Sequence, residues 1–293
     1  MENKSRIYSL LAVGVVVISF SGILIKLSTA PPLITAFYRM FFSSLILTPI
    51  LVIKHRQELK LFFDYRPALV GFFLAVHFYL WISAFEYTDV ANAVIFIALQ
   101  PLFTYLMEFL FAREDIYKGI LFGIITAFIG SVIISVGSIN VMFDKLWGDL
   151  LAVAAALFAG IYLFLGRSLR EEVDYLPYLY IVYTYAALFL GLFTLVQGIS
   201  FTGHIEGNLL YFLGLAVGPT LVGHSVLNYS VRFLTTTIVS LTILAEPVIT
   251  TFLAYILLGE VVSVITIVGA VFIMVGIYQA TMTARKREKV VEV

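Results

Sequence analysis

LQPLFTYLMEFLFARE (residues 99–114) and AEPVITTFLAYILLGE (residues 245–260) are two copies of one pattern within the same chain. Each is an apolar segment that contains a proline and ends in an acidic residue, and the copies lie 146 residues apart, close to half of the 293-residue chain. Five identities fall on this offset without a gap: Pro101 with Pro247, Thr104 with Thr250, Glu114 with Glu260, Gly123 with Gly269, and Gly130 with Gly276. The chain is therefore expected to contain two related units, 1–140 and 141–293.

The composition places both units in a lipid bilayer. The sequence is 61% hydrophobic and 12% charged, with a mean hydropathy of +1.04. Apolar runs of about 20 residues, the length needed to cross a bilayer, recur along it. The third and fourth runs nearly touch, as do the ninth and tenth, so a nine-span count stays open. We expect an all-α integral membrane protein with ten transmembrane helices: 7–26, 33–53, 67–87, 90–112, 116–137, 146–166, 178–198, 207–228, 236–258 and 261–283.

The span count decides how the two units are related. Each unit holds five of the ten expected spans, and a unit with an odd number of spans enters the membrane from opposite faces in its two copies. We therefore expect two inverted five-helix repeats, an arrangement typical of secondary transporters with a site near the middle of the bilayer.

The distribution of Lys and Arg among the loops predicts the orientation, because cytoplasmic loops carry an excess of basic residues. With the N-terminus inside, only Lys26 and Lys145 fall outside and Arg39 lies within a span. We expect a multi-pass protein of the cytoplasmic (inner) membrane with both termini in the cytoplasm. Fifteen basic residues then face the cytoplasm: Lys4, Arg6, Lys54, Arg56, Lys60, Arg66, Arg113, Lys118, Arg167, Arg170, Arg232, Arg285, Lys286, Arg287 and Lys289.

Several functions find no support in the sequence. Without cysteine there is no disulfide or thiolate metal site, and the four histidines have no ligand spacing. No G-x-x-x-x-G-K-[ST] motif for ATP occurs. The basic C-terminal tail is interpreted as a topology anchor rather than a nucleic-acid site. We expect no metal, no cofactor and no nucleic-acid partner, and a homodimer stays open.

The chain resembles the drug/metabolite transporter superfamily of the EamA type. The resemblance rests on the two five-span units, the repeated proline segments, the glycine-spaced last helix of each half, and Arg39 in TAFYRMFFSS (35–44). It implies export of a small metabolite or amino acid through a central cavity lined mainly by the first, third, fourth, sixth, eighth and ninth spans. The second unit departs at this arginine, where Tyr185 occupies the matching place.

Polar residues four apart form stripes inside five of the apolar spans, and residues at that spacing share one helix face. Such stripes are expected to avoid lipid. Their Ser and Thr hydroxyls are interpreted mainly as bonds between helices. The stripes are Thr35-Arg39-Ser43, His77-Trp81, Gln100-Thr104-Glu108, Thr220-His224-Asn228 and Thr242-Glu246-Thr250.

Glu246 is the strongest functional candidate. A carboxylate near the bilayer centre costs roughly 2.5–3.5 kcal/mol on insertion scales, so it faces a cavity or a partner. Glu246 and Gln100 occupy matching places directly before Pro247 and Pro101, where the missing N–H frees a carbonyl that a polar cavity can satisfy. We favour ligand or proton binding by Glu246, and the alternative is a structural kink with a protonated, hydrogen-bonded side chain.

The other candidates are weaker. A neutral imidazole suits a zwitterion or a proton relay as well as a structural bond between helices, so both readings stay open for His77 and His224. Arg39 is interpreted mainly as an anchor that snorkels to the headgroups, and Glu108 either pairs with Arg113 or lines the cytoplasmic mouth. Tyr162, Phe158 and Trp81 are placed to form an aromatic wall. Substrate binding or coupling is assigned to Glu246, His77, Trp81, Gln100, His224, Asn228, Tyr162 and Arg39.

Together these features predict a secondary transporter and not an enzyme. It exports a small amino acid-like or amphipathic molecule by alternating access, with proton coupling left open. The alternatives are a membrane-embedded enzyme, for which no nucleophile-base pair or metal set stands out, and a scaffold or receptor without transport, which leaves the polar stripes unexplained.

The charge bias predicts the result of cysteine labelling. Because the chain has no cysteine of its own, single cysteines at positions 56, 285, 144 and 260 report one site each. In intact cells an impermeant maleimide is expected to label positions 144 and 260 and to spare 56 and 285. Labelling of position 56 from outside contradicts this orientation.

Overall fold

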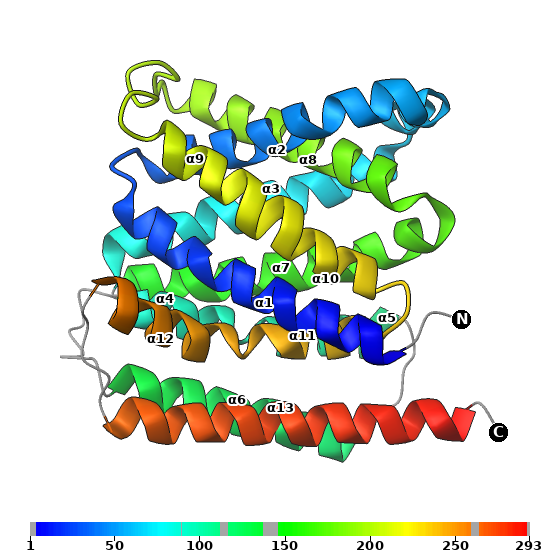
Figure 1. Cartoon of the computed structure of the whole chain (residues 1–293), viewed down its shortest axis with the longest axis vertical. Coiled ribbons are helices and arrows are strands. Elements are labelled where there is room, and N and C mark those ends of the chain that lie inside the picture. The colour runs from blue at the N-terminus through cyan, green and yellow to red at the C-terminus, as the bar shows by residue number, and fades with distance from the viewer. Residues whose placement is uncertain (1–3, 89, 112–116, 137–145, 259–263, 292–293) are drawn as a thin grey trace.

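The computed structural model describes residues 4–88, 90–111, 117–136, 146–258 and 264–291 (Figure 1). These residues form helices and connecting turns and contain no strand, so the all-α expectation is confirmed. Outside them lie Glu114 and Glu260, which end the repeated pattern, and the loop residues Arg113, Asp144 and Lys145. The helices of the first half are α1 (Lys4–Leu27), α2 (Pro32–Lys54), the 3₁₀ helix η1 (Arg56–Phe63), α3 (Tyr65–Tyr87), α4 (Val90–Ile97), α5 (Gln100–Phe111) and α6 (Lys118–Val136).

The second half follows the same order with more interruptions. One expected span, 207–228, is a path of three short segments whose middle part is a π-helix. The helices are α7 (Leu146–Glu172), α8 (Tyr175–Val196), α9 (Leu209–Leu215), the π-helix η3 (Ala216–His224), α10 (Ser225–Ser230), α11 (Thr236–Ile243), α12 (Glu246–Leu258) and α13 (Val264–Val291).

Length and apolar composition identify membrane-crossing segments in both halves. In the described part of the chain, shorter apolar helices cover Lys118–Gly130, Glu246–Leu257 and Ile267–Ala280. Six described segments are long and apolar enough to span a bilayer on their own: Ser5–Leu27, Pro32–Lys54, Tyr65–Tyr87, Trp147–Glu172, Tyr175–Val196 and Leu209–Ser230.

The expected spans 90–112 and 236–258 are not continuous helices, which corrects the sequence interpretation. A two-residue turn separates α4 from α5, and an equivalent turn separates α11 from α12. The helices before the turns end at Ile97 and Ile243, each four residues before a proline. Because Pro101 and Pro247 have no N–H to donate to these two carbonyls, the helical hydrogen-bond ladder stops there.

The internal repeat is visible in the helix boundaries. Helices α4 and α11 end 146 residues apart, at Ile97 and Ile243, and helices α5 and α12 begin 146 residues apart, at Gln100 and Glu246. The turns also agree, because Leu99 N–H donates to the Phe96 carbonyl and Ala245 N–H donates to the Thr242 carbonyl, at 3.1 and 3.2 Å. The two units therefore share their local backbone structure as well as their sequence pattern.

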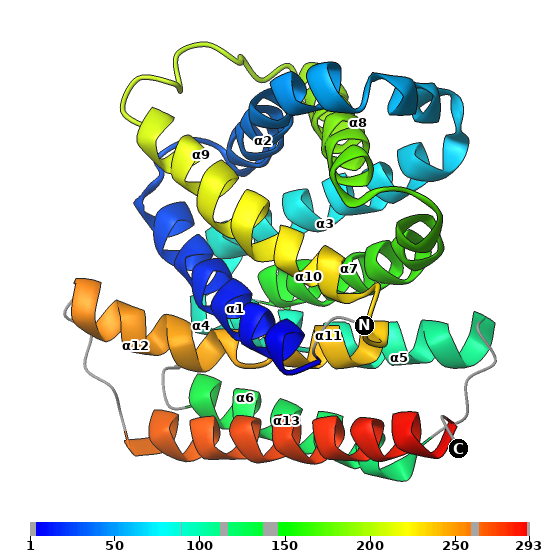
Figure 2. The ribbon, with the colours of Figure 1, turned by 45° about the vertical axis from the view of Figure 1, so that its right-hand side comes forward.

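The last helices of the two units pack against each other along one side of the molecule (Figures 1 and 2). Gly123 faces Gly276, and Gly130 faces Gly269, so α6 and α13 run antiparallel. On the 146-residue offset, Gly123 corresponds to Gly269 and Gly130 to Gly276. Exchanging the two halves thus converts each glycine contact into the other, as a twofold axis through this helix pair requires.

Asp64 caps the start of α3 and bonds to Arg66, which joins this end of α3 to the second half. Its carboxylate accepts hydrogen bonds from the Arg66 N–H and from Arg66 Nε, both at 2.9 Å. These bonds hold the pKa of Asp64 below its ordinary value. Arg66 Nη1 also lies 2.8 Å from the Glu172 carboxylate at the end of α7.

The glycine contact predicts a large effect of a small substitution. A Cβ at position 276 would lie 2.5 Å from the Gly123 carbonyl oxygen and the Ala127 nitrogen. Gly276→Ala is therefore expected to destabilise the protein by about 1–3 kcal/mol, the usual cost of overpacking. The measurement is the thermal denaturation midpoint in detergent.

Gly22→Ala is the matched control, because a Cβ at position 22 has its nearest contact at an ordinary 3.7 Å. It should leave the midpoint near that of the wild type. Equal midpoints for the two variants contradict close packing between α6 and α13.

Candidate functional site

Arg39 lies at the centre of a buried polar cluster. Its side chain is completely buried, although Arg39 is only about two turns into α2. Nε donates to Thr220 Oγ1 of η3 at 2.7 Å, and Nη1 donates to Ser21 Oγ of α1 at 3.2 Å. The guanidinium lies 4.1 Å from the centroid of the Phe78 ring of α3. Snorkelling to the headgroups is therefore the wrong interpretation of Arg39.

Two histidines extend this cluster around Phe78. His224, at the end of η3, lies edge-on to Phe78, with ring centroids 5.4 Å apart. The ring of His77, the preceding residue of α3, has its centroid 4.8 Å from that of Phe78, and His77 Nδ1 is 3.0 Å from the Ala155 carbonyl of α7. Because a carbonyl only accepts, Nδ1 carries the proton of neutral His77. Nε2 then carries the acceptor lone pair of the ring.

Glu246 belongs to the same electrostatic group. It is the first residue of α12, is 4% exposed, and lies close enough to Arg39 for their charges to interact. The charge of Arg39 also acts on His77 and His224. We call Ser21, Arg39, His77, Thr220, His224 and Glu246 the central polar cluster. It joins α1, α2 and α3 of the first half to η3 and α12 of the second.

Gln100 occupies the place in the first half that Glu246 has in the second. It is the first residue of α5 and is also 4% exposed. Its carbonyl accepts a hydrogen bond from Thr104 Oγ1 at 3.0 Å, and Thr104 Oγ1 lies 3.2 Å from Ser240 Oγ of α11. The broken helices touch crosswise, α4 with α12 and α5 with α11. That Gln100 and Glu246 share one cavity stays a prediction.

Trp81 lies one turn after His77 on α3. The two rings are stacked with centroids 6.3 Å apart, and the indole is 4% exposed. Its Nε1 has no hydrogen-bond acceptor among the described residues. Trp81 therefore holds a buried donor beside the central polar cluster.

Tyr162 and Asn228 meet in a second network around a buried arginine. Tyr162 Oη donates to Asn228 Oδ1 at 2.8 Å, and Arg170 Nη1 donates to the same oxygen at 2.8 Å. Arg170 also donates to Tyr178 Oη at 2.9 Å and to the Leu163 carbonyl at 2.6 Å. Asn228 Nδ2 donates to the His224 carbonyl at 2.9 Å, which connects this network to the central polar cluster.

The position of Arg170 corrects the sequence analysis, which counted it among cytoplasmic loop residues. The side chain is 1% exposed and lies within α7, which runs past the expected end of its span at residue 166. A glycine one turn earlier, Gly166, supplies the space, since a Cβ there would lie 2.5 Å from Arg170 Nη1. The pairing of Gly166 with Arg170 is the sequence signal that was missed. Ser21 and Phe78 were missed because neither stands out within an apolar span.

Glu108 pairs with a residue of the other half. Its side chain is 1% exposed, and Oε1 lies 3.8 Å from Arg167 Nη1 of α7. Among the described residues, Arg167 is thus the cation near Glu108. The alternative partner, Arg113, lies outside the described residues. The contact ties α5 to α7 at the end that the charge pattern places in the cytoplasm.

These features define a class of protein. The apolar helices bury two carboxylates, two guanidinium groups and one imidazole, and both carboxylates lie on helices that begin at a proline-induced break. Buried ionisable groups of this kind are typical of substrate or ion pathways in transporters.

The chain belongs to the EamA-like transporter family, whose sequence model matches residues 5–136 and again 146–282. An uncharacterized transporter of Archaeoglobus fulgidus is 26% identical over 276 residues, which cover 92% of this chain and 95% of that protein. The uncharacterized transporter YxxF of Bacillus subtilis is 26% identical over 211 residues, 70% of this chain and 66% of that protein.

A solved crystal structure shares the fold with a TM-score of 0.80. It is 16% identical to this chain, and the match covers 97% of this chain and 99% of the other. The family match confirms the expected resemblance and the class of transporter with two repeats.

The interaction between Arg39 and Glu246 predicts coupling in a double-mutant cycle. Arg39→Met and Glu246→Gln are each expected to destabilise the protein, and the double variant less than the sum of the two. The interaction energy is expected to be about 1 kcal/mol, as for charged residues of one network. It is measured from unfolding free energies in detergent.

Arg39→Met combined with Glu108→Gln serves as the control cycle, because Glu108 pairs with Arg167 instead. These two changes should add to within about 0.5 kcal/mol. Additivity in the Arg39 and Glu246 cycle would show that the two charges do not interact.

Proposed function

We propose that this transporter is a secondary carrier that exports a small amino acid-like or amphipathic molecule across the cytoplasmic membrane by alternating access. Ten spans form two inverted five-helix repeats, 1–140 and 141–293, with both termini in the cytoplasm. The observation that carries the proposal is the matched break in α4–α5 and α11–α12. It places Gln100 and Glu246 at two equivalent, buried helix starts, and broken helices of this kind form the substrate sites of many transporters.

The glycine contact supports the inverted arrangement. Helices α6 and α13 are equivalent in the repeat but run antiparallel, as expected when the two units insert in opposite directions. Gly123 and Gly130 lie so close to Gly276 and Gly269 that no Cβ fits between the helices, and we expect this pair of helices to move as one unit. Motion between inward-open and outward-open states then takes place elsewhere, in contacts between the other helices of the two halves.

Glu246 is proposed to couple binding to that motion. It lies in the second half, and the Arg39 charge with which it interacts lies in the first. A proton on Glu246, or a substrate amine bound to it, competes with Arg39 for the carboxylate. The ligand thereby weakens one electrostatic attraction between the halves, and a ligand shifts a conformational equilibrium only when it interacts differently with the two states.

The surroundings of the cluster favour a substrate with a polar head and an apolar body. The buried rings of Phe78 and Trp81 lie on α3, which also carries His77, and the buried rings of Tyr162 and Tyr183 lie on α7 and α8. Aromatic walls with few convergent polar groups are typical of small-molecule sites. A hydrophobic amino acid fits this description, with its amine at Glu246 and its carboxylate facing the unpartnered Nη2 of Arg39.

Glu246→Gln tests the role of the carboxylate, since it keeps the volume and most hydrogen bonds but cannot ionise. If Glu246 exchanges a proton, the purified variant in proteoliposomes should lose pH-driven transport and keep substrate exchange. If Glu246 holds the amine, binding should fall instead, because a charge-assisted hydrogen bond is roughly twice as strong as a neutral one. Transport is measured with a panel of amino acids, amines and nucleobases, with and without a pH gradient.

Glu108→Gln is the matched control, because it removes an equally buried carboxylate outside the central polar cluster. It should retain the pH dependence of the wild type. Wild-type binding and wild-type pH dependence in Glu246→Gln contradict the proposed role. Failure of the wild-type protein to transport any compound of the panel contradicts the carrier function.

A further inference from the structure

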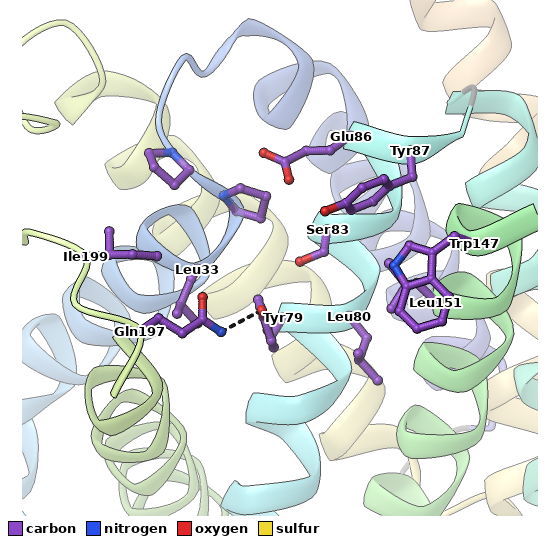
Figure 3. A pocket seen from close by; sticks show the side chains of 12 residues that line it. Leu33, Tyr79, Leu80, Ser83, Glu86, Tyr87, Trp147, Leu151, Gln197 and Ile199 are labelled. Atoms are coloured by element: carbon purple, nitrogen blue, oxygen red, sulfur yellow. Dashed lines mark hydrogen bonds between the residues drawn. The ribbon is translucent and has the colours of Figure 1, made fainter. Parts of the chain in front are cut away.

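A pocket of about 430 Å³ lies apart from the central polar cluster, at the end of α3 that the charge pattern places outside the cell (Figure 3). It is bounded by the last two turns of α3, the starts of α2 and α7, and the residues that follow α8. Its volume is within the range of small-molecule sites. None of its lining residues belongs to the central polar cluster.

Glu86 gives this pocket its charge. The side chain lines the pocket, is exposed, and makes no ion pair or hydrogen bond with any described residue. The described residues that line the pocket include no lysine, arginine or histidine. On its described lining the pocket therefore favours a cation and disfavours an anion, which would meet the Glu86 carboxylate.

Aromatic rings supply the second element of recognition. Tyr79, Tyr87 and Trp147 line the pocket together with Glu86 (Figure 3). Tyr79 is held in place by Gln197, whose Nε2 donates to its hydroxyl at 2.8 Å. Aromatic faces attract cations, and Trp more strongly than Tyr, by about 0.5–1 kcal/mol at exposed sites.

The shape of the lining further restricts the ligand. Leu80, Leu151 and Pro32 cover the remaining walls with apolar surface, and Ser83 adds one hydroxyl. A hydrated metal ion gains little from such walls, because it needs several oxygen ligands. An ammonium group with apolar substituents satisfies the carboxylate, the rings and the aliphatic walls together.

We propose that this pocket is a separate binding site for organic ammonium compounds, with Glu86 as the counter-charge and Tyr87 and Trp147 as aromatic contacts. It is accessible from the end of α3 opposite to Arg66. On the same helix, His77 of the central polar cluster and its neighbour Phe78 lie two to three turns before Glu86. The site does not depend on Glu246, and its occupation is independent of whether the protein transports the same compound.

The position of the two tryptophans makes the site measurable. Trp81 and Trp147 are the two tryptophans of the chain, and Trp147 lines the pocket. In a Trp81→Phe background, Trp147 alone reports on the pocket by its fluorescence. Titration of the purified protein with benzyltrimethylammonium is expected to give a saturable change, and benzoate, an anion of similar size, none.

Glu86→Gln in this background is expected to weaken binding of benzyltrimethylammonium about three- to tenfold, the range expected for a partly exposed ion pair and its cation–π contacts. Glu206→Gln is the matched control. It removes one exposed carboxylate at the same end of the molecule but outside the pocket, and it should bind as the parent does.

Three results would overturn the proposal. They are the absence of a saturable change in the parent, equal affinities of Glu86→Gln and the parent, and equal weakening by Glu86→Gln and Glu206→Gln. Weakening by Glu246→Gln without any effect of Glu86→Gln would place the cation in the central polar cluster instead. If the wild-type protein transports no compound of the panel but benzyltrimethylammonium still binds at Trp147, only the carrier proposal is contradicted.

Discussion

Two missing backbone hydrogen bonds, at Pro101 and Pro247, determine how the polar centre of this protein is built. A bilayer offers no water to satisfy a free carbonyl, so a helix interrupted within it must turn its break toward other protein groups. The breaks at Ile97 and Ile243 are therefore buried between the two halves, where α4 contacts α12 and α5 contacts α11. Each break starts a new helix at that depth, and the new N-terminus favours a carboxylate such as Glu246 by its dipole.

The charge of Arg39 is the counterpart of this carboxylate. A buried guanidinium is stable only when its donors and its charge are compensated. Hydroxyls from α1 and η3, the Phe78 ring and the Glu246 charge share this task. The π-helix contributes geometrically, since Thr220 Oγ1 donates to Leu215 five residues earlier and also accepts from Arg39. Wider turns of this kind occur often at functional sites.

The central polar cluster and the Arg170 network form one connected system. Asn228 of α10 accepts a hydrogen bond from Arg170 and donates one to the His224 carbonyl. A shift of α10 therefore changes the Arg170 network and the central polar cluster together. Toward the predicted cytoplasmic end, Glu108–Arg167 and Arg66–Glu172 add contacts between the halves. Toward the other end, the Thr88 hydroxyl donates to the Asp149 carboxylate at 2.7 Å, and the Thr29 N–H donates to Asn208 Oδ1. An alternating carrier needs such contacts near both ends, because one set must open while the other closes.

The sequence by itself determined the bilayer as solvent, the two related units and the positions of the polar stripes along the apolar segments. The hydropathy of a segment and the positions of its prolines and glycines are local properties. They shape that segment in the same way whichever helix packs against it. Only the tertiary structure decided which polar groups meet. A stripe on one helix has the same pattern whether it faces Arg39 or a backbone carbonyl, so His77, bonded to Ala155, and His224, beside Phe78, were equivalent in sequence. Arg170 resembled a loop residue because its burial depends on Tyr178 and Asn228, which come from two other helices.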